Sequence, residues 1–307
     1  MTVTTAQIVD VTARDGFQIV KDWIPTEFKK QVLDGLVAAG VKKIEATSFV
    51  SPKAVPQLAD AADIVRHMRQ HHPDVTTVAL VPNLRGARNA AEAGALTINC
   101  VISASEEHNK NNIRRTHEES LNDIAAIADS LPQCTISVGL ATTFGCPFVG
   151  SVPVGTTIGL IGDLLARGVQ SVTLADTIGV ANPRQVKAVI RAVRAVYPNL
   201  DLALHMHDTH GMGLANMAAA LDEGVNVFET AAGGMGGCPF APGAAGNTAT
   251  EDTVNMLHRM GVETGIDLDA YLDVVRMIRE NIPVPLPGRL VVARGFREFV
   301  FFDAQGA

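Results

Sequence analysis

One pattern constrains the fold of this chain more than any other: a short apolar segment, a polar loop and a segment with helical periodicity follow one another eight times. The apolar segments are short and largely apolar on both faces, which is typical of strands buried in a parallel sheet. In the first helical segment, 25–40, Phe28, Val32 and Leu36 recur at helical spacing. Eight such units predict an α/β fold, a (β/α)₈ TIM barrel.

The expected elements alternate along the chain. We expect strands at 8–11, 43–49, 75–80, 96–103, 135–141, 171–174, 202–207 and 225–229. We expect helices at 25–40, 59–71, 117–130, 155–167, 183–197, 212–223 and 248–260, with a short one ending at Gly94. The polar segment 105–112 is expected to be a loop. Gly40, Gly168 and Gly224 follow three of these helices, where a positive φ is needed.

The length of 307 residues exceeds the roughly 250 that such a barrel needs. We therefore expect a catalytic barrel over 1–261 and a C-terminal extension over 262–307. The extension begins with a helix over 268–280 and continues as a Pro-rich segment, 283–288. Its apolar end, 296–302, predicts a docking surface, and with it a homodimer, because an exposed apolar cluster needs burial.

Composition excludes several classes of protein. The formal net charge is −7 and no block of Lys or Arg stands out, so a nucleic-acid partner is not expected. No apolar stretch reaches membrane-spanning length, and the N-terminus has no secretory leader. The four cysteines are widely spaced without a CxxC pair, which predicts a reduced, cytoplasmic enzyme.

The strand ends carry the candidate chemistry, because catalytic residues of such barrels lie at the carboxyl ends of the strands. His205 and His207 point to one face of a strand, about 7 Å apart at Cα, and suit a divalent metal. The alternative is a hydrogen-bonded histidine pair. The other polar residues at strand ends or in the following loops are Arg14, Asp15, Glu45, Thr47, Ser48, Asn109, Lys110, Asp176, Asp208, Cys238 and Asn247. A carboxylate, two imidazoles and an amide oxygen suit Mg²⁺ or Mn²⁺, with tetrahedral Zn²⁺ as the alternative.

Five motifs together resemble the 3-hydroxy-3-methylglutaryl-CoA (HMG-CoA) lyase family. They are 14–18 (RDGFQ), 47–53 (TSFVSPK), 176–180 (DTIGV), 205–209 (HMHDT) and 236–241 (GGCPFA) followed by Gly246-Asn247. The RDG and HxHD elements also occur in the wider metallolyase superfamily, including isopropylmalate synthase and 4-hydroxy-2-oxovalerate aldolase. The Gly-Gly-Cys-Pro loop points to the lyase branch. The resemblance covers about residues 8–290.

The resemblance implies a role for each matching residue. The metal ligands would be Asp15, His205, His207 and Asn247. The catalytic set would be Arg14, Glu45, Asp176, His205 and Cys238, in which Arg14 stabilises an enolate oxygen and Cys238 acts as acid or base. The substrate and CoA contacts would be Gln18, Lys21, Ser48, Asn109, Lys110 and Thr173.

Simpler interpretations stay open for several of these residues. Arg14 and Asp15 alone fit a structural salt bridge, and Glu45 fits a structural partner of Arg14. Cys238 alone fits an inert buried thiol, and Lys110 fits a solvated loop. We expect the three other cysteines to be structural and His210 to lie behind the metal ligands or at the surface.

The reaction implied by the resemblance is a metal-dependent carbon–carbon cleavage of HMG-CoA, or a related 3-hydroxyacyl-CoA, to acetyl-CoA and a 3-oxo acid. Such a reaction belongs to leucine degradation and ketone-body formation. A divalent cation lowers the pKa of the substrate hydroxyl, and an arginine stays charged beside the enolate. The alternatives are an aldolase or condensing synthase of the same superfamily, or an inactive barrel used as a binding scaffold.

Several positions depart from the family pattern. The family has Glu at Asp10, Gly-Pro at 12–13, Tyr at His210 and Gln at Met212, and 141–144 also differs. These positions lie near the expected pocket, so they leave room for an acyl group other than methylglutaryl.

Overall fold

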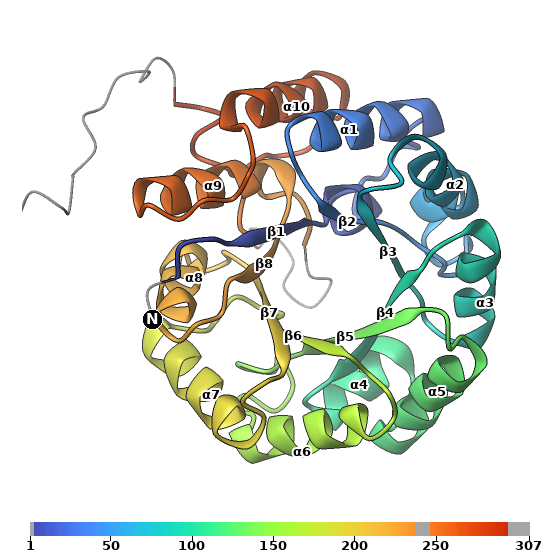
Figure 1. Cartoon of the computed structure of the whole chain (residues 1–307), viewed down its shortest axis with the longest axis vertical. Coiled ribbons are helices and arrows are strands. Elements are labelled where there is room, and N and C mark those ends of the chain that lie inside the picture. Colours follow the sequence, from blue (N-terminus) through green and yellow to red (C-terminus); the bar gives the residue numbers. More distant parts are fainter. Residues whose placement is uncertain (1–2, 238–245, 294–307) are drawn as a thin grey trace, which may run out of the picture.

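The eight apolar segments form eight parallel strands that close into a barrel in sequence order, with β8 pairing to β1 (Figure 1). The computed structural model describes residues 3–237 and 246–293. The strands are β1 Gln7–Asp10, β2 Lys43–Ser48, β3 Thr76–Leu80, β4 Thr97–Ser103, β5 Thr135–Ala141, β6 Ser171–Asp176, β7 Asp201–Met206 and β8 Val227–Thr230. The predicted TIM barrel is therefore confirmed, and the predicted strand ends differ by two residues or fewer.

Helices surround the barrel (Figure 1). They are α1 Thr26–Ala38, α2 Ala61–His71, α3 Leu84–Ala93, α4 Glu106–Ile113, α5 His117–Ser130, α6 Val154–Leu165, α7 Pro183–Val196, α8 Gly213–Asp222, α9 Thr250–Arg259 and α10 Leu268–Asn281. α7 shows why they pack there, because Val186, Val189, Ile190 and Val193 form one apolar stripe and all are buried. Burying side chains of this size contributes about 1.5–3 kcal/mol each. The apolar stripes of the helices therefore hold the ring against the sheet.

Glycine ends three of these helices as predicted. Gly40, Gly168 and Gly224 all have positive φ. At Gly40 the constraint is also steric, because a Cβ atom there would lie 2.3 Å from the carbonyl oxygen of Gly265. The turn from α1 into β2 therefore depends on glycine.

The prediction of a loop at 105–112 is wrong, because most of this segment forms α4. Its polar sequence lacks the apolar stripe that identifies a helix, but local hydrogen bonds replace that signal. The Ser105 hydroxyl accepts one of the free backbone N–H groups at the start of α4, that of His108, at 3.3 Å. Lys110 pairs with Glu106 one turn earlier at 3.1 Å.

The C-terminal extension packs on the barrel through α10, which contacts α1 and α9. The Tyr271 hydroxyl on α10 donates a hydrogen bond of 2.5 Å to Asp10 at the end of β1. The barrel boundary at residue 261 stays a prediction, because α10 shares the core of the barrel. The apolar end at 296–302 lies outside the described residues. No helix in the described ranges has the length and apolar character needed to cross a membrane.

Candidate metal centre and active site

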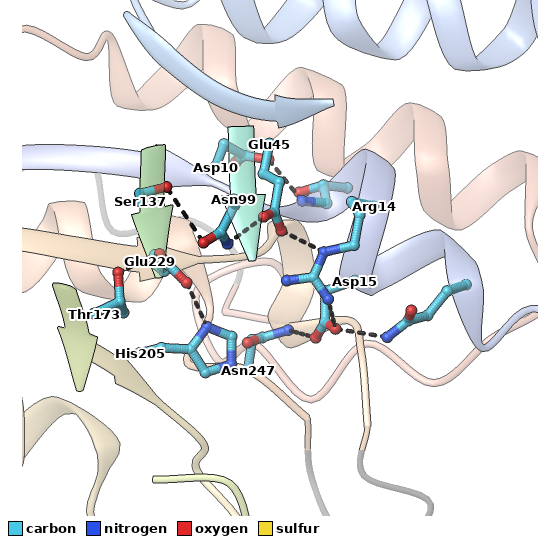
Figure 2. Close-up of polar contacts among 12 residues, drawn as sticks. Asp10, Arg14, Asp15, Glu45, Asn99, Ser137, Thr173, His205, Glu229 and Asn247 are labelled. Atoms are coloured by element: carbon cyan, nitrogen blue, oxygen red, sulfur yellow. Dashed lines mark hydrogen bonds and ion pairs between the residues drawn. The ribbon is translucent and has the colours of Figure 1, made fainter. Parts of the chain in front are cut away.

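The candidate site lies where β1, β7 and β8 end (Figure 2). Arg14 and Asp15 lie in a π-helical turn, Thr12–Gly16, that follows β1 directly. The turn is tight because the backbone N–H groups of Arg14, Asp15 and Gly16 all donate to the carbonyl oxygen of Val11. The turn therefore brings both charged side chains into the mouth of the barrel, near His205 on β7 and His207 just after it.

Asp15, His205 and His207 come together as predicted. One ligand atom of each lies within 4.8 Å of the others, and all three residues are buried. The two imidazole rings are 5.0 Å apart at their centroids. His205 uses Nδ1 to contact Glu229 at 2.9 Å, which leaves its Nε2 for a ligand. His207 Nδ1 is buried and has no hydrogen-bond partner among the described residues.

Asn247 completes this group. Its Nδ2 donates to Asp15 Oδ2 at 2.7 Å and to the Met235 carbonyl at 2.8 Å. These two bonds fix the amide so that Oδ1 is left buried, with no partner in the described part of the chain. Gly236 makes room for it: its φ is +111°, and a Cβ atom would lie 2.4 Å from Asn247 Nδ2.

The four side chains fit a divalent cation. An unpaired buried atom costs about 1–3 kcal/mol, so His207 Nδ1 and Asn247 Oδ1 are costly unless something binds them. A cation among Asp15, His205, His207 and Asn247 would satisfy both atoms and take one carboxylate, one amide oxygen and two imidazoles. This mixed set of nitrogen and oxygen donors suits Mg²⁺ or Mn²⁺.

The charges in the site keep Asp15 ionised and His207 neutral, which are the states that bind a metal, and they raise the pKa of His205. Burial alone would raise the pKa of Asp15, but the positive charge of Arg14, the neighbouring imidazoles and the hydrogen bond from Asn247 lower it, so the carboxylate stays ionised. Burial lowers the pKa of His207 to about 4, which keeps this imidazole neutral. Burial would also lower the pKa of His205, but its hydrogen bond to Glu229 raises it.

Arg14 is held rigidly beside the centre. Its guanidinium pairs with Glu45 through Nε and with Asp15 through Nη1. Burial alone would lower the pKa of Arg14, but the charges of Glu45 and Asp15 raise it. Glu45 is itself fixed by Asn99, whose Nδ2 donates to Oε1 at 2.7 Å. The arginine therefore presents a fixed positive charge within the barrel mouth.

Sequence reasoning missed two residues of this network, Glu229 and Asn99. Glu229 on β8 pairs in register with His205 on β7 and accepts a hydrogen bond from Thr173 Oγ1 at 2.8 Å. The sequence offers one signal that could have drawn attention to Glu229, a carboxylate in an apolar strand that neighbours the histidine strand, but not its pairing with His205. Carboxylate partners of this kind fix the tautomer of a ligating histidine.

The remaining predicted residues divide into two groups. Gln18 donates to Asp15 at 2.6 Å, and Ser48 is buried at the end of β2 with an unpaired hydroxyl in the described structure. Asp176 accepts from the backbone N–H groups of Val180 and Ala181, at 3.0 and 2.9 Å, and so shapes the loop after β6.

The other group lies away from these contacts. Asn109 is buried and binds the backbone around α4, and Lys110 pairs with Glu106 on the same helix. The structure does not bring either side chain to the metal-centre residues. Lys21 is exposed. Cys238 lies outside the described residues. His210 is exposed and contacts the Gly179 carbonyl at 2.7 Å, which fits the surface alternative of the prediction.

Comparisons of the sequence and of the structure with known proteins agree on one family. A family model described as HMGL-like matches residues 5–278. Hydroxymethylglutaryl-CoA lyase YngG of Bacillus subtilis is 43% identical over 284 residues, which cover 92% of this chain and 95% of that protein. The crystal structure of the Bacillus subtilis HMG-CoA lyase superposes with a TM-score of 0.91 at 42% identity, covering 95% of this chain and 99% of that one.

A further structure carries ligands. An HMG-CoA lyase from Acinetobacter baumannii, in complex with coenzyme A and 3-methylmalate, has a TM-score of 0.91 at 40% identity. The match covers 97% of both chains.

Proposed function

Because the chain belongs to the HMGL-like family, we propose that it is a divalent-metal-dependent lyase that cleaves HMG-CoA to acetyl-CoA and acetoacetate. One observation carries the proposal beyond family membership. Two buried atoms, His207 Nδ1 and Asn247 Oδ1, have no hydrogen-bond partner among the described residues, and they belong to side chains that gather at the Asp15 carboxylate beside the Arg14 guanidinium. Cleavage of a tertiary alcohol into an enolate needs both a cation site and a fixed positive donor.

Asp15, His205, His207 and Asn247 would hold the metal. When bound, a divalent cation supplies Lewis acidity that lowers the pKa of the substrate's tertiary hydroxyl. The protein contributes the order of the site: Glu229 fixes the tautomer of His205, and Asp15 and Met235 fix the amide of Asn247. Mg²⁺ and Mn²⁺ are both consistent with this donor set.

Arg14 would stabilise the enolate oxygen of the departing acetyl-CoA. Its ion pairs with Glu45 and Asp15 hold the guanidinium in place before the substrate arrives, so little reorganisation is needed as charge develops. An arginine is the suitable donor because it stays charged at any working pH. Preorganised donors of this kind contribute about 2.7–4 kcal/mol to transition-state stabilisation.

Cys238 would transfer the proton. A thiol has an ordinary pKa near 8.5, and positive charge nearby lowers it toward neutrality. The residue follows two glycines and precedes Pro239, in the motif that resembles the lyase family. Lys21, as an exposed side chain after the π-helical turn, is the proposed contact for the CoA phosphates.

The setting of the enzyme is also part of the proposal. We place it in the cytoplasm, in leucine degradation and ketone-body formation, acting on an acyl-CoA substrate as a homodimer. The three described cysteines are buried thiols, which fits a reducing compartment.

Turnover of HMG-CoA tests the proposal. The protein is incubated with HMG-CoA and Mg²⁺ or Mn²⁺, and acetyl-CoA and acetoacetate are quantified. We expect equimolar products, loss of activity with chelator and recovery after metal is restored. A parallel reaction with a 4-hydroxy-2-oxo acid tests the aldolase alternative. Cleavage of that acid alone, or no product from any 3-hydroxyacyl-CoA, would overturn the proposal.

A further inference from the structure

A second cluster of imidazole and carboxylate side chains lies in the outer layer of the barrel, between α1 and α2, which pack side by side (Figure 1). Asp34 lies on α1, His67 lies on α2, and His72 directly follows the last residue of α2. One ligand atom of each lies within 4.8 Å of the others. We propose that Asp34, His67 and His72 bind a Zn²⁺ ion, separate from the metal centre in the barrel mouth.

The three side chains already converge on one point. His67 Nε2 lies 2.7 Å and His72 Nε2 lies 2.6 Å from the same oxygen, Asp34 Oδ1. Ligand atoms of a tetrahedral Zn²⁺ site lie about 3.3 Å apart, as follows from metal–ligand distances of about 2.0–2.2 Å. The oxygen must therefore move away from each nitrogen by about 0.7 Å to admit the ion.

The exposure of each side chain fits this adjustment. The imidazoles of His67 and His72 are only 13% and 19% exposed, so the packing around them holds them in place. The Asp34 side chain is 46% exposed and is free to shift. This opening to solvent also gives an ion a path to the site and leaves room for water as the fourth ligand.

The donor chemistry selects the metal. Two imidazole nitrogens, one carboxylate oxygen and a water form a four-ligand set that Zn²⁺ accepts in tetrahedral geometry, whereas Mg²⁺ needs six ligands in an octahedron. The site also lies at the C-terminal end of α2, where the helix dipole favours a cation. Partial burial alone would raise the pKa of Asp34, but hydrogen bonds from His72 and His67 lower it, so the carboxylate is anionic.

The position of the cluster indicates a structural role. At the N-terminal ends of α1 and α2, the buried Lys29 already joins the pair through Asp60 at 2.9 Å. The cluster lies toward the C-terminal ends of the same helices, which in this fold face the barrel end opposite the active site. A bound ion would join the two helices at this second end. The inference is independent of the proposed lyase activity.

Zinc stoichiometry of the full-length, untagged protein tests the inference. Bound Zn²⁺ is counted by equilibrium dialysis and elemental analysis for wild type, His67→Gln, His72→Gln and His71→Gln. His71 is the matched control, because its ring stacks on His67 at 4.7 Å without belonging to the ligand set. We expect one equivalent fewer in His67→Gln and in His72→Gln, and the wild-type number in His71→Gln.

Two further measurements keep the result interpretable. Zn²⁺ should raise the melting temperature of wild type by about 2–4 °C more than that of His67→Gln. If a histidine variant fails to fold, Asp34→Asn takes its place, because it preserves the shape of the side chain. This variant should bind one equivalent of Zn²⁺ fewer than wild type. Equal zinc content in wild type and the two ligand variants would overturn the proposal, and so would loss of the equivalent in His71→Gln.

Discussion

Glu229→Gln is the substitution that most sharply separates a metal centre from a hydrogen-bonded histidine pair. Thr173 Oγ1 donates to Oε1 of Glu229, and Oε2 contacts His205 Nδ1 at 2.9 Å. In the glutamine variant, Thr173 would hold the amide oxygen and so turn the NH₂ group toward His205. Nδ1 would then have to accept, which places the ring proton on Nε2 and blocks the nitrogen that a metal needs.

The expected effect on metal binding is large. Loss of a carboxylate partner of a ligating histidine weakens metal affinity about 10- to 100-fold, or about 1.4–2.7 kcal/mol. Mn²⁺ affinity measured by titration should fall by that factor, and activity should recover in part at high Mn²⁺. Glu280→Gln, an exposed change of the same chemistry on α10, should bind Mn²⁺ like wild type. If Glu229→Gln matches wild type within twofold, His205 is not a ligand oriented by Glu229.

Three other changes probe the rest of the structure. Gly236→Ala places a methyl group against the Asn247 amide, at a residue whose φ is +111°. The affinity for Mn²⁺, measured by titration, should fall at least roughly tenfold, and an unchanged affinity would contradict this packing. Asn109→Ala removes four hydrogen bonds, so the free energy of unfolding measured by chemical denaturation should fall by about 2–4 kcal/mol. A change in KM without any change in stability would instead indicate that Asn109 contacts the substrate. Burial raises the pKa of Glu251 to about 7 from its ordinary 4.5, so its protonated form stabilises the fold below about pH 4.5, and that contribution is lost as pH rises to about 7. The free energy of unfolding of Glu251→Gln in urea, relative to that of wild type, should therefore rise by about 3 kcal/mol between pH 4.5 and pH 8. A difference in stability that does not change with pH would refute the burial argument.

The barrel and the meeting of its strand-end residues could be predicted from the sequence for one physical reason, and the family resemblance then singled out the metal ligands among them. Parallel strands end at one edge, so residues that follow different strands meet there although they lie far apart in the chain. His205 lies on β7 and His207 directly follows its last residue, so the two side chains, two residues apart in extended chain, face the same side. Asp15 and Asn247, separated by most of the chain, meet through a hydrogen bond of 2.7 Å.

The features that sequence reasoning missed depend on contacts that periodicity does not encode. α4 has no apolar stripe, and the Ser105 cap and the buried Asn109 side chain stabilise it instead. The role of Glu229 follows from the register of β7 against β8, which pairs it with His205 and which no local pattern reveals. Asp176 reads as a site residue at a strand end, yet its carboxylate binds backbone N–H groups of the next loop.

The position of a bound Mn²⁺ ion in crystals of the protein, located by anomalous scattering, tests the central claim most directly. Our account predicts one peak in the barrel mouth, about 2.0–2.3 Å from Asp15, His205 Nε2, an imidazole nitrogen of His207 and Asn247 Oδ1. An ion that contacts neither histidine, or a mouth without a peak at saturating Mn²⁺, would contradict it.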